Sequence, residues 1–215
     1  MKTNRITFFL IVFLSFQCIG FSQQNTLSPK EITAFKKEVA LKAKNTNTLS
    51  SNFTQTKQIS VLNNSIISTG KLVYKSPNLV RWEYITPKSN IAIFKDNLLL
   101  VFNDGKRKSI DLDSNKWFKQ LNTLIVNSVI GDLFDDETFE IDYFSTKTDY
   151  LVVFKPKNKR LRKYMAQFEL TFPKHEYVVK TVKLIEPNND FTLIEFKFLN
   201  ATIQALTKLI FFRFA

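Results

Sequence analysis

The sequence predicts a mainly β domain: an unclosed, strongly curved antiparallel sheet accompanied by two helical segments. From residue 49 onward, short runs in which apolar and polar residues alternate are separated at regular intervals by turn residues. Only two stretches, near residues 28–45 and 114–133, show helical spacing of their apolar residues instead. Many short strands with few helices are typical of an antiparallel barrel or incomplete barrel.

The N-terminal segment has the features of a secretory signal peptide. Lys2 and Arg5 give it a basic start, and Ile6–Phe16 is an apolar run that is short for a membrane span. Small residues follow, so we expect cleavage after Ser22. Residues 1–22 are then the signal, and residues 23–215 form a single mature domain.

Cysteine content and charge narrow the class of protein. Cys18 is the only cysteine, and the large polar Gln17 before it does not suit a lipoprotein signal, so we expect Cys18 to leave with the signal. The alternatives are an uncleaved membrane anchor and a lipid attached to Cys18. The formal net charge is +12, with one basic cluster at Lys155–Lys163. We interpret this cluster as a hairpin loop facing solvent or lipid headgroups, because it lacks the interleaved aromatics of a nucleic-acid platform.

The first helix should begin at a complete capping signal. Ser28 is the expected N-cap, Pro29 stands at the first helical position, and Glu31 completes a capping box. Leu27 and Ile32 have the spacing of a hydrophobic staple. The apolar residues that recur at helical spacing are Ile32, Phe35, Val39 and Ala43.

The strands follow from the period-two pattern, with Asp104-Gly105 as a two-residue hairpin turn and prolines as further breaks. We expect strands at Leu49–Ser60, Ile66–Tyr74, Leu79–Ile85, Asn90–Lys95, Leu98–Asn103, Lys106–Leu112, Phe139–Phe144, Tyr150–Lys155, Lys163–Phe172, Val178–Ile185, Phe191–Leu199 and Leu209–Phe214.

The second helical segment, residues 114–133, carries an apolar stripe. Two helices over a long sheet leave either a cleft between them or a filled core, and both alternatives are open from the sequence. The chain's 22 phenylalanines suit either one. The stripe consists of Trp117, Leu121, Leu124, Ile125 and Val129.

The hairpin region Gly70–Pro87, which reads GKLVYKSPNLVRWEYITP, resembles the signature region of the LolA family. The matching elements are Phe53 and Gln55 upstream, then Gly70, then the run Ser76–Tyr84. The resemblance implies a periplasmic carrier of outer-membrane lipoproteins, with a helical lid over a hydrophobic cavity for acyl chains. It also implies acylated lipoproteins as cargo, an inner-membrane release complex and an outer-membrane acceptor. We expect a monomer.

The resemblance implies that segment 114–133 is the lid. LolA-like carriers commonly place an arginine in this hairpin to hold the closed lid, and Arg81 is the candidate here. Strand alternation puts Arg81 opposite Trp82 and Tyr84, so either the arginine or the aromatic pair faces the cavity. A surface ion pair with Glu83 is the alternative role for Arg81. The residues expected to line the cavity or lid are Arg81, Trp82, Tyr84, Ile91, Ile93, Leu98, Leu100, Phe102, Trp117, Leu121, Leu124, Ile125, Val129, Phe168 and Leu170.

The sequence contains few residues or motifs that are typical of enzyme active sites. His175, the only histidine, stands in an expected turn, and neither a nucleophile motif nor metal-ligand spacing is present. We therefore predict a protein that is not an enzyme and needs no metal or cofactor. The remaining alternatives are a LolA-like paralogue carrying another lipid or apolar product, an exported hydrolase, and an adaptor domain with a filled core.

Overall fold

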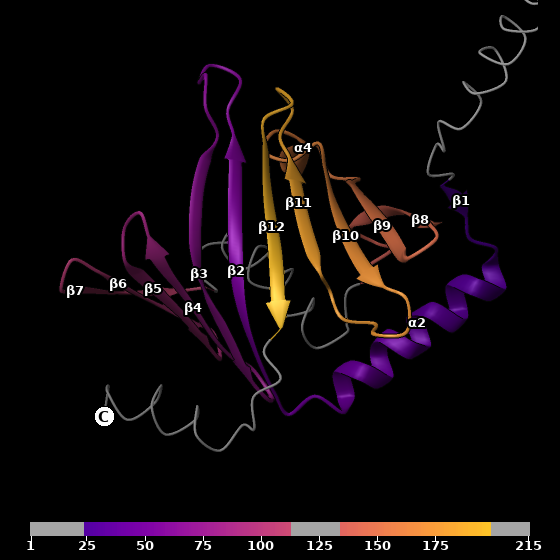
Figure 1. Ribbon diagram of the computed structural model, residues 1–215, viewed down its shortest axis with the longest axis horizontal. Coiled ribbons are helices and arrows are strands. Elements are labelled where there is room, and N and C mark those ends of the chain that lie inside the picture. Colours follow the sequence, from indigo (N-terminus) through magenta and orange to yellow (C-terminus); the bar gives the residue numbers. More distant parts are fainter. Residues whose placement is uncertain (1–23, 113–133, 199–215) are drawn as a thin grey trace, which may run out of the picture.

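The computed structural model describes residues 24–112 and 134–198 of the chain. Within them, twelve antiparallel strands form one sheet in the order β1-β8-β9-β10-β11-β12-β2-β3-β4-β5-β6-β7. The two edge strands, β1 and β7, do not pair with each other, so the sheet curves without closing (Figure 1). The predicted mainly β, unclosed antiparallel architecture is confirmed.

Most strand bounds lie within a few residues of the predicted runs, but β1 was not predicted and β11 begins three residues later than the expected strand at Val178–Ile185. The strands are β1 (Asn25–Thr26), β2 (Thr48–Gln58), β3 (Ile66–Lys75), β4 (Leu79–Thr86), β5 (Asn90–Lys95), β6 (Leu98–Asn103), β7 (Lys106–Asp111), β8 (Phe139–Ser145), β9 (Asp149–Pro156), β10 (Gln167–Pro173), β11 (Thr181–Ile185) and β12 (Phe191–Phe198). The helices in the described part of the chain are α2 (Pro29–Lys44) and α4 (Lys159–Arg162).

The basic cluster departs from the prediction, because it forms the short helix α4 instead of a plain hairpin loop. The side chain of Asn158 caps α4 by accepting a hydrogen bond from the backbone N–H of Arg160 at 2.7 Å. The guanidinium of Arg162 donates to the carbonyl oxygens of Pro156 and Lys157. The expected strand at Lys163–Phe172 is therefore shortened, and β10 begins only after this turn.

Helix α2 begins as the capping signal predicts. The backbone N–H of Ser28 donates to the Glu31 carboxylate at 2.8 Å, and the Ser28 side chain accepts from the N–H of Glu31. The hydrogen bonds from the Ser28 hydroxyl and N–H lower the pKa of Glu31. Leu27 is buried and Ile32 packs against the same cluster, consistent with a hydrophobic staple.

Two glycines have specific backbone roles. Asp104 and Gly105 both have positive φ, 50° and 74°, as a two-residue hairpin turn requires, so the predicted turn between β6 and β7 is confirmed. Gly70 lies beneath the Phe53 ring: a Cβ there would overlap both that ring and the carbonyl oxygen of Glu83. A glycine is therefore needed for β2, β3 and β4 to pack together at this point.

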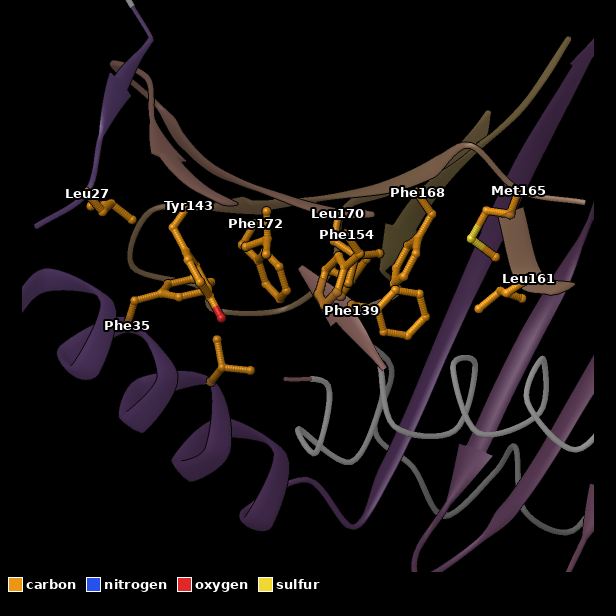
Figure 2. Packing of buried hydrophobic residues seen from close by; sticks show 13 residues of the cluster. Leu27, Phe35, Phe139, Tyr143, Phe154, Leu161, Met165, Phe168, Leu170 and Phe172 are labelled. Atoms are coloured by element: carbon orange, nitrogen blue, oxygen red, sulfur yellow. The ribbon is translucent and has the colours of Figure 1, made fainter. Parts of the chain in front are cut away.

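Within residues 24–112 and 134–198, the buried apolar residues form two clusters. The helix-side core joins α2 to β8, β9 and β10 and consists of Leu27, Phe35, Val39, Phe139, Tyr143, Val152, Phe154, Leu161, Met165, Phe168, Leu170, Phe172 and Val179 (Figure 2). The hairpin-side core belongs mainly to β2–β6 and consists of Phe53, Leu72, Tyr74, Val80, Trp82, Phe94, Leu99 and Leu112.

Several predictions concern parts of the chain outside the described residues. These are the signal peptide, the strand at Leu209–Phe214 and the lid segment 114–133 with Trp117, Leu121, Leu124, Ile125 and Val129. In the part of the chain that the structure describes, no helix is both long enough and apolar enough to cross a membrane.

Candidate functional site

An apolar cavity with a volume of about 350 Å³ lies between the two cores. The last turns of α2 and the residues after it form one side, and strands from both halves of the sheet form the other. Its described lining residues are Val39, Lys42, Ala43, Thr46, Leu49, Leu72, Trp82, Tyr84, Ala92, Phe94, Met165, Phe168, Leu170, Tyr177, Val178, Val179, Val182, Leu184, Thr192, Ile194, Phe196 and Phe198.

The lining has the chemistry of a hydrocarbon-binding site. Lys42 is the only charged residue among the described lining residues, and it is exposed at the end of α2. The other polar groups are the hydroxyls of two threonines and two tyrosines and one indole N–H. A cavity of this kind favours an apolar ligand, because a polar ligand would lose its hydration without gaining enough hydrogen bonds.

The hairpin-side wall is built from the residues of the Phe53–Tyr84 sequence pattern. The Phe53 ring lies 4.6 Å from the Trp82 ring and 5.3 Å from the Tyr84 ring, the latter in an edge-to-face arrangement. The Tyr84 hydroxyl donates to the Gln55 side-chain oxygen at 2.8 Å. The residues of this sequence pattern therefore form one cluster across β2, β3 and β4. The absence of a side chain at Gly70 leaves room for the Phe53 ring.

The pKa of Tyr84 reflects this apolar setting. Burial raises it above the ordinary tyrosine value, and the neighbouring Trp82 indole acts in the opposite direction. The phenol therefore stays protonated near neutral pH. It serves as a hydrogen-bond donor to Gln55 and contributes an apolar ring to the cavity wall.

The wall opposite this hairpin-side wall comes from β10, β11 and β12, and the sequence predicts only Phe168 and Leu170 of it. Strand β12 pairs with β2, which puts Ile194 opposite Gln55 and Phe196 opposite Phe53. This pairing brings the end of the described chain beside its first long strand. No local sequence signal gives that neighbour relationship, and so the lining residues Val182, Leu184, Ile194 and Phe196 were not anticipated.

The structure divides the predicted site residues into three groups. Trp82, Tyr84, Phe168 and Leu170 line the cavity. Trp117, Leu121, Leu124, Ile125 and Val129 lie outside the described residues. Arg81, Ile91, Ile93, Leu98, Leu100 and Phe102 lie on the other face of β4, β5 and β6.

Strand register explains this last group. Arg81 pairs with Ile93, which pairs with Leu100, while Trp82 pairs with Ala92 on the cavity side. The aromatic pair therefore faces the cavity, and the Arg81 guanidinium donates to Glu83 at 3.0 Å on the opposite face. Arg81 is only 8% exposed, so this ion pair is largely buried. A contact between Arg81 and the lid segment stays a prediction.

The residues described at the cavity include no histidine, cysteine or carboxylate. His175 is exposed in a turn, with φ at 73°. Among the described residues, no group of three or more His, Cys, Asp or Glu side chains is arranged to hold a metal ion. The cavity's described walls offer binding surface instead of reactive groups.

A family model described as outer membrane lipoprotein carrier protein LolA matches residues 44–213. The chain belongs to the LolA family. The match begins at the end of α2 and includes every strand from β2 to β12, and therefore both walls of the cavity. The resemblance seen at Gly70–Pro87 is thus confirmed over most of this LolA-family chain.

Solved structures with similarity to this LolA-family chain include three from different bacteria. A LolA superfamily protein from Nitrosomonas europaea is 7% identical, with 80% of this chain and 96% of that chain covered and a TM-score of 0.39. A putative outer membrane lipoprotein-sorting protein domain from Vibrio parahaemolyticus is 9% identical, with 78% and 92% covered and a TM-score of 0.41. The Mycobacterium tuberculosis lipoprotein LppX is 7% identical, with 81% and 98% covered and a TM-score of 0.45. No curated protein sequence matches the chain significantly.

Proposed function

We propose that the protein is a periplasmic carrier that binds acyl chains of lipoproteins in the cavity and transfers them from the inner to the outer membrane. The observation that carries this proposal is the cavity of about 350 Å³, whose described lining is apolar except for a few hydroxyls, one indole N–H and Lys42 at its rim. Membership in a family of lipoprotein carriers supports it. In this proposal the protein acts by binding its cargo and not as an enzyme.

The cavity volume sets how much of a cargo fits. A cavity of about 350 Å³ lies within the range of about 300–1,000 Å³ that is usual for small-molecule sites, and it has room for at least one acyl chain of about a dozen carbons. At about 0.8 kcal/mol per buried methylene, this contributes on the order of 9 kcal/mol, or roughly micromolar affinity or tighter.

Such affinity has a consequence for transfer. A chain that leaves the cavity for water loses the whole burial free energy, so release into solution is slow compared with handover to another apolar site. The proposed carrier therefore takes cargo directly from an inner-membrane release complex and gives it directly to an outer-membrane acceptor. Segment 114–133 is proposed as the lid that governs this exchange.

The proposal is tested with a fluorescent single-chain fatty acid added to the purified protein. Saturable binding at one probe per protein supports it, with a change in tryptophan fluorescence because Trp82 lines the cavity. If the probe does not bind and the protein unfolds as a tightly packed domain, the adaptor alternative is favoured instead.

The intact mass of the exported protein tests whether the signal peptide is cleaved. A chain beginning at Gln23 is expected, whereas a retained, lipid-bearing Cys18 would contradict a carrier in transit.

A second candidate is a LolA-like paralogue that carries another lipid or apolar product. The described lining is apolar and has no feature specific to a lipoprotein, so it suits any hydrocarbon chain and supports this candidate as well. Cross-linking in cells followed by mass spectrometry of the captured cargo distinguishes the two. Acylated lipoproteins support the first proposal, and a free single-chain lipid supports the second.

A further inference from the structure

The hairpin of β2 and β3 ends in an exposed aliphatic tip, residues 59–67. Val61 is 85% exposed and Ile67 is 60% exposed, while Leu62 and Ile66 are each a little over 40% exposed. The tip lies at the far end of the sheet from the α2–β2 connection (Figure 1). The largest exposed apolar patch on a folded monomer, typically about 300–600 Å², is often an interaction site.

Local hydrogen bonds hold this tip in shape. The Asp190 carboxylate, on a residue only 7% exposed, accepts a hydrogen bond from the backbone N–H of Ser60 at 2.7 Å. The N–H of Leu62 donates to the carbonyl oxygen of Ile59 at 2.9 Å, and the Ser65 hydroxyl donates to the Gln58 side chain. The exposure of Val61 and its neighbours is therefore a consequence of ordered backbone structure.

The charge pattern of the tip indicates the kind of partner. No charged residue occurs between Lys57 and Lys71, and the residues between the aliphatic positions are asparagine and serine. Lys57, at the base of the tip, lies 3.9 Å from Glu186. An uncharged aliphatic tip can enter the apolar edge of a bilayer without burying an ion, and a basic protein is attracted to anionic headgroups.

We propose that the β2–β3 tip inserts into the interfacial region of a lipid bilayer. Four partly exposed aliphatic side chains offer roughly a few hundred Å², which is well below the area of about 1,000 Å² that a specific protein–protein interface needs. The strength of interfacial lipid binding instead rises with the apolar area buried and with attraction to anionic headgroups, so a small apolar tip on a basic protein can contribute. The tip is separate from the cavity lining, so this inference does not depend on what the cavity binds.

The test is co-sedimentation of the purified protein with phosphatidylcholine vesicles, with and without added phosphatidylglycerol. The double variant Val61→Ser, Ile67→Ser removes the two most exposed aliphatic side chains of the tip without adding charge. We expect it to bind both kinds of vesicle at least tenfold more weakly than the parent. Leu41→Ser, which removes a 43% exposed leucine from α2, is the matched control and should bind like the parent.

Thermal unfolding and fatty-acid binding of the variants should equal those of the parent, which shows that the fold and the cavity are intact. Failure of the parent to bind phosphatidylcholine vesicles overturns the inference, as does equal binding by the parent and the double variant. Binding that requires phosphatidylglycerol and ignores the tip would assign the contact to the basic surface. A dimer in sedimentation velocity that dissociates in the double variant would assign the tip to a second copy of the chain.

Discussion

Both cores of the sheet line the cavity in part, but only the helix-side core also contains a filled aromatic cluster around Phe35. In the helix-side core, Phe35 of α2 packs against Tyr150 at 4.8 Å and Phe172 at 5.2 Å, so aromatic rings fill the space between helix and sheet. In the hairpin-side core, Trp82 packs on Phe53 yet also lines a cavity.

Helix α2 shows the same difference along its own length. Phe35, near its middle, is buried in the helix-side core, whereas Lys42 and Ala43, in its last turn, line the cavity. The comparison indicates that the packing partner, more than composition, decides whether an aromatic-rich face becomes core or binding surface.

The largest expected effect distinguishes the two cores by stability. Phe35→Ala leaves a void among several aromatic rings and should lower the free energy of unfolding by about 3–5 kcal/mol. Fatty-acid binding per folded molecule should stay close to that of the parent, because Phe35 does not line the cavity. Urea unfolding and probe titration measure the two quantities. A loss well below 1 kcal/mol would mean that the helix-side core is not tightly packed.

An intermediate effect is expected at Gly70, where the wall of the cavity is assembled. Gly70→Ala pushes a methyl group against the Phe53 ring and the Glu83 carbonyl, and should cost about 1–3 kcal/mol. Because Phe53 supports Trp82 and Tyr84, the same variant should weaken fatty-acid binding. Gly105→Ala is the control: its Cβ meets open space, so only the positive φ opposes it, at about 1 kcal/mol. If both variants bind the probe equally, the Phe53 cluster does not shape the cavity.

The smallest effect concerns the cap of α2 and depends on pH. Hydrogen bonds from Ser28 lower the pKa of Glu31 in the folded state. A carboxyl group whose pKa is lowered by folding stabilises the protein at pH values above its unfolded-state pKa, which is about 4.3 for glutamate. This contribution is lost as the pH falls through the folded-state pKa. Glu31→Gln should therefore be slightly less stable than the parent at pH 7 and converge with it at acid pH. A pH-independent difference in unfolding temperature would argue against a role for the charge.

Local chemistry explains what the sequence predicted well. Ser28, Pro29 and Glu31 specify the start of α2, and Asp104-Gly105 specifies a turn, because each depends only on neighbouring residues. Alternation also showed correctly that Arg81 and Trp82 face opposite ways.

The cavity could not be predicted to the same degree. Strands β5 and β6 are apolar on both faces, so periodicity did not reveal that Ala92 lines the cavity and Ile91 does not. The β11–β12 wall depends on pairing between β12 and β2, which is a long-range property of the sheet. The helix α4 was missed because its capping residue, Asn158, also reads as a turn residue.

The central claim, that the space between the two cores holds an apolar chain, is tested most directly by filling it. Ala92→Phe adds a ring on the cavity face of β5, and Ile91→Phe adds bulk on the opposite face of the same strand. We predict that Ala92→Phe remains folded and loses at least tenfold in fatty-acid affinity, while Ile91→Phe binds like the parent. Equal affinity in the two variants, or unfolding of Ala92→Phe with an overpacking cost of several kcal/mol, would contradict the account.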